Sequence, residues 1–337
     1  MDQEHSSPDE DVIVNRQLID VMYANGSLTR EARLSALRFI YPHDQWGRWS
    51  AQLLLLIGSA LMLSGMVYFF AYNWAKIPSL VKLSMVASVM IGCSIGAYIK
   101  TLEALSGRVL LLGASVSVGV FMAVFGQVYQ TGADAFELFM MWSIFSLGWT
   151  IISRFAAQWV LWLVITNMFL ILWWDQAAHP SHALKEMIFV YLILFNGLAL
   201  VGREYGLQCK RYQWLSHHWT RHLLSLVIIS LSFISFVSWL FARRKSLSHD
   251  IAAGLGVCTH AACYAYYRYR SLSLGSLALV MLSASMMLVC AIFHELLASK
   301  SDLIFITFSG GFSTLVVFSA ATFHLRTLMK TRGDTHV

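Results

Sequence analysis

Charge is what this sequence has least of. Only 12% of its 337 residues are Asp, Glu, Lys or Arg, whereas 58% are hydrophobic. Soluble domains carry about 25% charged and about 45–50% apolar residues. The shortage of charge excludes an ordinary soluble domain and indicates a chain that crosses a membrane several times. The net charge of +6 does not indicate a nucleic-acid partner, because Lys and Arg of membrane proteins gather in loops that face anionic lipid.

Proline and the common catalytic and metal-binding motifs are also scarce. The chain has four prolines, so its long helices are seldom interrupted. It has five cysteines but no Cys-x-x-Cys pair, which argues against a zinc ribbon and against a disulfide framework. A nucleophile elbow, a His-Glu-x-x-His helix and the glycine-rich phosphate and dinucleotide loops are missing as well. We therefore predict a protein that is not an enzyme and that holds no metal and no cofactor.

The first 48 residues are polar and lack the apolar core of a signal peptide. We therefore expect the first membrane helix to direct insertion. Apolar residues recur at helical spacing on both sides of Asn25-Gly26, a pair that breaks the chain. The prediction for residues 1–48 is a disordered start followed by a cytoplasmic helical hairpin over residues 11–24 and 28–41.

Ten apolar segments follow, each long enough for a membrane-spanning helix, which needs about 20 residues. They cover residues 51–71, 79–99, 108–129, 135–153, 156–174, 184–202, 221–241, 250–267, 272–293 and 303–324. The predicted fold class is all-α: a polytopic transmembrane helix bundle of about ten spans over residues 49–326, with a cytoplasmic tail over residues 327–337.

The basic residues predict how these spans are oriented. If the N-terminus lies inside, 17 of the 24 Lys and Arg fall on the inner side and the remaining 7 fall outside. Cytoplasmic loops of membrane proteins carry the excess of positive charge. We therefore expect both termini in the cytoplasm. The run Arg243-Arg244-Lys245 lies on the predicted outer side and opposes this orientation.

Two strings of residues carry a family resemblance. The first string lies at the end of the first predicted span and reads Phe70-Ala71-Tyr72-Asn73-Trp74. The string Gly126-Gln127-Val128-Tyr129-Gln130-Thr131-Gly132-Ala133-Asp134 joins the third span to the fourth. Together with the hairpin, they resemble the DUF2157 family of bacterial membrane proteins over roughly residues 12–175. The resemblance implies a multi-pass protein of the bacterial inner membrane. It brings no catalytic residues and no established biochemical role.

Polar side chains concentrate at the turn between the third and fourth spans. Gln127 and Gln130 are three residues apart and share one face of the third helix. Asp134 and Glu137 have the same spacing at the start of the fourth. Burying ionisable groups in a membrane is costly, so such residues often mark a functional site. The predicted polar site has six candidate residues: Asn73, Gln127, Tyr129, Gln130, Asp134 and Glu137.

The two carboxylates also have a purely structural interpretation. Asp134-x-x-Glu137 has the spacing of a capping box, with Asp in place of Ser or Thr. Both charges would then complement the positive end of the helix dipole. Capping does not account for Gln127, Tyr129 and Gln130. The sequence leaves both interpretations open.

Two functions fit this pattern. In the first hypothesis, the protein handles a small polar solute or ion at a polar site formed by the outer ends of the first, third and fourth helices. In the alternative, it is a non-transporting scaffold or sensor, and the polar turn docks an envelope protein. Transport requires polar residues along a continuous path, whereas docking requires them only at the surface. Asn167 and Asn196 lie deep in the fifth and sixth spans, where hydrogen bonding between helices is their usual role.

Overall fold

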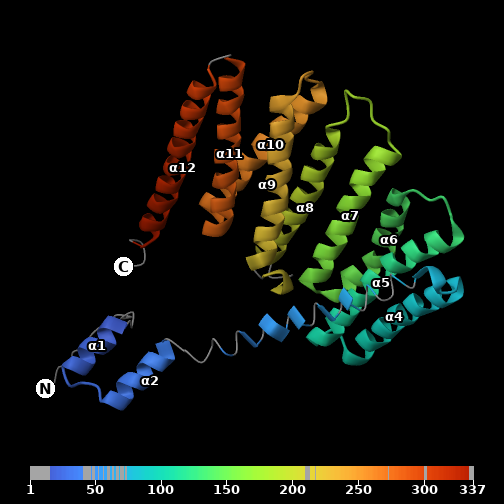
Figure 1. Ribbon diagram of the computed structural model, residues 1–337, viewed down its shortest axis with the longest axis horizontal. Helices are drawn as coiled ribbons and strands as arrows, with labels where there is room; N and C mark the ends of the chain where they lie inside the picture. The colour runs from blue at the N-terminus through green and yellow to red at the C-terminus, as the bar shows by residue number, and fades with distance from the viewer. Residues whose placement is uncertain are drawn as a thin grey trace. The chain divides into compact units, whose positions relative to one another are not determined.

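The structure is a computed structural model. It describes residues 16–40, 74–208, 213–216, 218–271, 273–299 and 302–333, together with single positions between 47 and 72. Helices make up most of this part of the chain, and no strand occurs in it (Figure 1). The predicted all-α class is confirmed. The chain divides into two compact units, Met1–Pro78 and Ser79–Val337, whereas the boundary predicted from the sequence lies between residues 48 and 49.

The first unit contains the predicted helical hairpin. Gly26 supplies the positive φ of 75° that the connection between the two helices requires. Thr29 caps the second helix, because its Oγ1 accepts a hydrogen bond of 3.2 Å from the backbone N–H of Ala32. The two helices are tied by an ion pair of 2.7 Å between Arg33 Nη2 and Asp20 Oδ1. The helices are α1 (Arg16–Ala24) and α2 (Arg30–Ile40).

The first predicted span, residues 51–71, is described only at isolated positions. The candidate residue Asn73 lies outside the described residues. That span and that site residue therefore stay predictions. The continuous description begins again at a short 3₁₀ turn, η1 (Trp74–Lys76).

The second unit contains nine long helices that correspond to the other nine predicted spans. They are α4 (Ser79–Lys100), α5 (Leu105–Tyr129), α6 (Ala135–Ser153), α7 (Ala156–Gln176), α8 (Met187–Gln208), α9 (His218–Phe241), α10 (Leu247–Ala265), α11 (Leu274–Ala298) and α12 (Leu303–Gly333). The prediction for α6 matches at both ends. Two short turns accompany them: η2 (Gln213–Leu215) and the π-helical η3 (Tyr266–Arg270).

Eight of these helices are long and apolar enough to cross a membrane. The exception is α10. Its sequence contains His249, Asp250 and His260, which lower its hydropathy below that of its neighbours. It nevertheless packs into the second unit against α8, α9 and α11. Large apolar side chains are exposed along many of the other helices, as expected where lipid rather than water is the solvent.

Helices α6, α7, α8 and α9 lie side by side in Figure 1, and each packs against the next one in the chain, whereas α11 packs mainly against α9 and α12. Helix α9 contacts α8, α10 and α11. Short connections make consecutive helices antiparallel. The carboxyl ends of α6, α8 and α10 therefore lie at the same end of the unit as the amino ends of α5, α7, α9 and α11.

Charge differs between the two ends of this unit. We call the end just defined the basic end. Its acids are Glu103 and Glu204, and its basic residues include Arg108, Arg154, Arg203, Arg221, Arg268 and Arg270. The opposite end, the acidic end, carries Asp134, Glu137, Asp175, Glu186, Asp250 and Glu295, together with the basic residues Lys185, Arg243, Arg244 and Lys245.

Close packing of α5 against α6 depends on a glycine. A Cβ atom added at Gly119 would lie 2.5 Å from the ring of Trp142. The same indole is fixed by a hydrogen bond of 2.7 Å from its Nε1 to the backbone oxygen of Ser115. The ring therefore has little freedom to move away, and the sequence needs glycine at this position for the helices to approach.

We predict that Gly119→Ala destabilises the protein by roughly 1–3 kcal/mol, the usual cost of overpacking. Gly148→Ala is the matched control, because it lies in α6 and a Cβ there meets nothing within 4 Å. The control should be neutral or slightly stabilising, since Ala is favoured over Gly inside a helix by up to about 1 kcal/mol. Thermal unfolding in detergent measures both. Equal stabilities for the two variants would contradict the packing described.

Candidate functional site

The predicted polar turn lies at the acidic end, between α5 and α6. Gln130 ends α5 in the left-handed conformation, with a φ of 47°, and its N–H bonds to the backbone oxygen of Gly126. The ring of Tyr129 lies 4.6 Å from that of Phe125. Gln127, Tyr129 and Gln130 are all exposed. The turn therefore presents these three side chains at the surface.

A hollow of about 500 Å³ lies beside this turn. Asp134 and Glu137 both line it, and apolar side chains form much of the remaining wall. These are Met122, Phe125, Leu138, Met140 and Met141. Gln127, Tyr129 and Gln130 are not among the lining residues. The structure thus brings the two carboxylates of the predicted site together in one hollow but places the other three side chains outside its wall.

The start of α6 is not capped as a capping box would be. Asp134 occupies the N-cap position with an extended backbone, but its side chain makes no capping hydrogen bond. Instead, the N–H of Phe136 donates to Oε1 of Gln176 at the end of α7, at 3.1 Å. Glu137 lies in the first turn of α6. Both carboxylates remain placed to interact with the helix dipole, and a residue of α7 satisfies one of the free N–H groups.

Deeper in the bundle, polar side chains of different helices bond to one another. Asn167 of α7 and Asn196 of α8 form a reciprocal pair, with Nδ2 to Oδ1 distances of 3.2 and 2.7 Å. Both amides also donate to the backbone oxygen four residues earlier in their own helix. This confirms the interpretation of these two residues as contacts between helices.

A second set of polar contacts joins α5, α6 and α7. Gln158 is fully buried, and its Nε2 lies 2.6 Å from Ser115 Oγ. The hydroxyls of Ser143 and Thr166 lie 2.9 Å apart. Hydrogen bonds of this kind hold membrane helices together and are worth about 0.6 kcal/mol on average. These residues therefore fix how the three helices pack.

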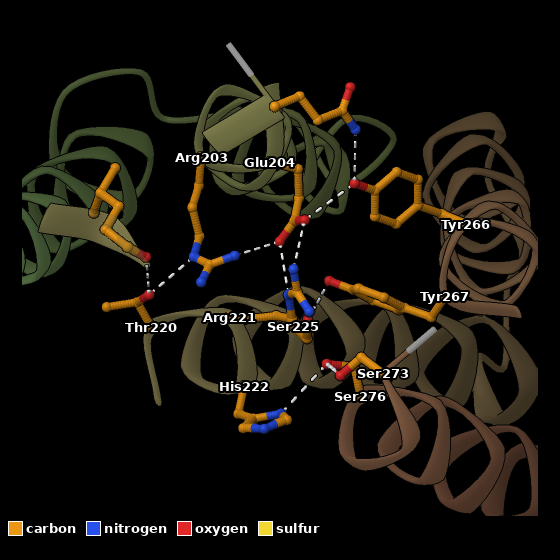
Figure 2. A network of polar contacts seen from close by, with 12 residues as sticks. Arg203, Glu204, Thr220, Arg221, His222, Ser225, Tyr266, Tyr267, Ser273 and Ser276 are labelled. Carbon is orange, nitrogen blue, oxygen red and sulfur yellow. Dashed lines mark hydrogen bonds and ion pairs between the residues drawn. The ribbon is translucent and has the colours of Figure 1, made fainter. Parts of the chain in front are cut away.

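The strongest polar cluster lies at the basic end, where Figure 2 shows it between α8, α9 and η3. Glu204 is 6% exposed, and one of its oxygens, Oε1, accepts from Arg203 Nη1 and from Arg221 Nε at 2.9 Å. Its other oxygen, Oε2, accepts from Arg221 Nη2 and from the hydroxyl of Tyr266, both at 3.0 Å. We call Arg203, Glu204 and Arg221 the ion-pair cluster.

Further hydrogen bonds extend this cluster into the neighbouring helices (Figure 2). Arg203 Nε donates to Thr220 Oγ1 at 2.9 Å, which links α8 to the start of α9. The hydroxyls of Ser225 and Tyr267 are 2.8 Å apart, which links α9 to η3. The π-helical turn lets two successive tyrosines, at 266 and 267, bond to groups of α8 and α9. Three elements of the second unit, α8, α9 and η3, are therefore held together here.

This cluster is not among the sites predicted from the sequence, where Arg203 and Arg221 count only among the basic residues that orient the spans and Glu204 is not a candidate. The feature of the sequence that could have indicated it is the carboxylate of Glu204, which follows Arg203 at the end of the sixth apolar segment. Next to this cluster, the Nδ1 of His222 lies 3.3 Å from Ser276 Oγ. Within the part of the chain that the structure describes, no group of three or more His, Cys, Asp or Glu could hold a metal ion.

We predict that Glu204→Gln is strongly destabilising. The substitution keeps the shape of the side chain but leaves two guanidinium charges without their counter-charge, and breaking a buried ion pair costs about 3–5 kcal/mol. Glu295→Gln is the control, because the Glu295 side chain is 81% exposed and should lose little. Unfolding in bilayer-like bicelles measures both variants. A Glu204→Gln protein as stable as the control would refute the role given to the carboxylate.

Comparison with known proteins finds a family match over part of the chain. The sequence model described as "Predicted membrane protein (DUF2157)" matches residues 22–159. This segment includes α2 and the α5–α6 hollow and stops near the start of α7, so the ion-pair cluster lies beyond it. No curated protein and no solved structure gives a significant match. Over residues 22–159 this multi-pass membrane protein matches the DUF2157 family, the one that the sequence resemblance indicated.

Proposed function

We propose that the protein binds a small solute with a cationic group in the hollow between α5 and α6. One observation carries the proposal: Asp134 and Glu137 both line this hollow. Two carboxylates in a largely apolar wall suit a ligand with a positive group and an apolar body. Ligand sites are commonly hollows of this size, roughly 300–1,000 Å³, with few polar groups among apolar ones.

In this proposal, the other candidate residues contact the solute from outside the wall of the hollow. Gln127, Tyr129 and Gln130 are exposed on the same turn, whereas the candidate Asn73 lies outside the described residues. The amide of Gln127 or Gln130, or the phenol of Tyr129, could bond to the polar part of a solute on its way into the hollow. The alanine variants of these residues test this part separately from the carboxylates.

We propose that the protein lies in a bacterial inner membrane, with the basic end and both termini in the cytoplasm. The excess of Arg at the basic end and the acids at the opposite end support this orientation. The hollow then faces the outer side. The run Arg243-Arg244-Lys245 lies between α9 and α10 at that same side, where Lys245 Nζ stacks 3.9 Å from the Trp239 ring centre.

A second candidate function is a non-transporting scaffold or sensor that docks an envelope protein. It is favoured by the pairing of polar side chains deep in the bundle. Asn167 and Asn196 form hydrogen bonds to each other, so these amides already bond within the bundle rather than to a transported solute. The family match carries no enzymatic activity with it, and the proposal contains no chemical step.

Binding is tested with choline and putrescine as probes on the purified protein in detergent. A cation that binds the folded state stabilises it, by about 2.7 kcal/mol at a concentration one hundredfold above Kd. We expect either probe to raise the unfolding temperature of the wild type. Glu137→Gln should remove that rise because it deletes one of the two carboxylate charges. Asp175→Asn, an exposed acid at the same end, should keep it.

No rise with either probe, or a rise that survives in Glu137→Gln, would refute the cation site. The Gln130→Ala variant tests whether the exposed turn outside the hollow also contributes to binding. Uptake of the bound probe into proteoliposomes distinguishes the two functions. Uptake supports solute transport, whereas binding without uptake favours a sensor.

Orientation is tested with reporter fusions placed at the C-terminus, within residues 131–134 and within residues 243–245. We expect a cytoplasmic signal from the first and an outer signal from the other two. The opposite pattern would contradict the proposed orientation. A cytoplasmic signal at residues 243–245 alone would show that α9 and α10 do not pass through the membrane as proposed.

A further inference from the structure

Methionine is concentrated around the hollow between α5 and α6. The chain contains 15 methionines among its 337 residues, and Met122, Met140 and Met141 all line this one hollow. The thioether of methionine is soft and polarisable, and three rotatable bonds let its sulfur adjust its position. Asp134 and Glu137 line the same hollow. Thioether sulfurs and carboxylates therefore share one cavity.

The topology brings the three methionines to a similar depth. Met122 lies seven residues before Tyr129, the last residue of α5. Met140 and Met141 lie five and six residues after Ala135, the first residue of α6. At 1.5 Å per residue, these offsets are about 10 Å and about 8–9 Å. Because α5 and α6 are consecutive, antiparallel and packed together, methionines of both helices lie at nearly the same level of the hollow.

The two carboxylates lie nearer the acidic end than these sulfurs. Asp134 is the N-cap of α6, and Glu137 lies in the first turn. Met140 and Met141 follow Glu137 by three and four residues, which makes them its neighbours on the helix surface, one turn deeper. A cation that enters from the acidic end therefore meets negative charge first and thioether sulfur second.

Ligand chemistry indicates which class of cation suits this order. Thioethers select soft ions such as Cu(I), whereas Mg²⁺ and Ca²⁺ prefer oxygen ligands alone. We propose that the hollow binds one soft monovalent metal ion, with the sulfurs of Met122, Met140 and Met141 as its ligands. The carboxylates of Asp134 and Glu137 attract the ion. This inference rests on the cation site proposed above, because it uses the same hollow and the same two charges.

Such a site departs from the expectation, drawn from Cys and His motifs, that the protein holds no metal. Those motifs do not include methionine, and neither do the groups of His, Cys, Asp and Glu that are absent from the described residues. Methionine also fills gaps between helices without binding anything. Substitution by leucine separates the two roles, because leucine has a similar volume and apolar character but no sulfur.

The test is a competition titration in which the purified full-length protein withdraws Cu(I) from bicinchoninate under anaerobic, reducing conditions. Thiols are first blocked with N-ethylmaleimide, because Cys258 is exposed and thiolates also bind Cu(I). We expect the wild type to bind the ion at one site. The variant in which all three methionines of the hollow are leucine should lose that site.

A single substitution keeps the test independent of folding. Met141 is 40% exposed, so Met141→Leu should leave the fold intact. It should still weaken Cu(I) binding by about tenfold or more, since even the loss of a group that supports a metal ligand typically costs about 10–100-fold. Met286→Leu is the matched control, because Met286 is 43% exposed on α11 and does not line the hollow. The control should bind Cu(I) as the wild type does.

Failure of the wild type to withdraw Cu(I), or a site that survives in the triple leucine variant, would overturn the inference. Zn²⁺ is the second probe, because its usual ligands are Cys, His and carboxylates. The three leucine substitutions should therefore change any affinity for Zn²⁺ little. An equal loss of affinity for both ions would contradict a site that selects soft ions.

The result is distinguishable from that of the proposed function. Stabilisation by choline or putrescine without binding of Cu(I) would leave the organic-cation site in place and refute the metal site. Methionine-dependent binding of Cu(I) without any effect of choline or putrescine would support the metal site and refute the organic-cation proposal.

Discussion

Pairing of buried polar groups is the constraint on which the second unit of this protein depends. Lipid offers no hydrogen bonds, so each polar group between membrane helices needs a partner within the protein. Glu204 shows the constraint most clearly, because Arg203, Arg221 and Tyr266 donate to its two oxygens. The same requirement explains the reciprocal Asn167–Asn196 pair. Each such contact is satisfied in one register of the helices only, so together they specify how α5 to α11 pack.

The two ends of the unit differ in what they can do. At the acidic end, Asp134 and Glu137 line an open hollow, and the segment that matches a family includes them. At the basic end, the charges are engaged with one another and join α8, α9 and η3. The first arrangement leaves carboxylates available to a ligand. The second stabilises the bundle.

Much of this fold could be predicted from hydropathy alone. The predicted limits of α6 are correct because the charged residues Asp134 and Arg154 lie at the two ends of its apolar run. The cap that Gln176 gives to α6 could not be predicted, because it depends on where α7 ends in space. The ion-pair cluster could not be predicted for the same reason. Glu204 and Arg221 lie 17 residues apart, on two helices whose rotation the sequence does not give. In the predicted site, spacing found the two carboxylates but could not show which side chains of the turn face the hollow.

Charge compensation around Glu204 is the central claim, and a double-mutant cycle with Arg221 tests it most directly. The free energy of unfolding is measured in bicelles for Glu204→Gln, Arg221→Gln and the double variant. Removing Arg221 from the Glu204→Gln protein takes away a repelling charge, so we expect the double variant to be more stable than the sum of the two losses. Directly interacting residues typically show coupling of about 0.5–3 kcal/mol. Losses that simply add would contradict the account, because the carboxylate and the guanidinium would then act independently.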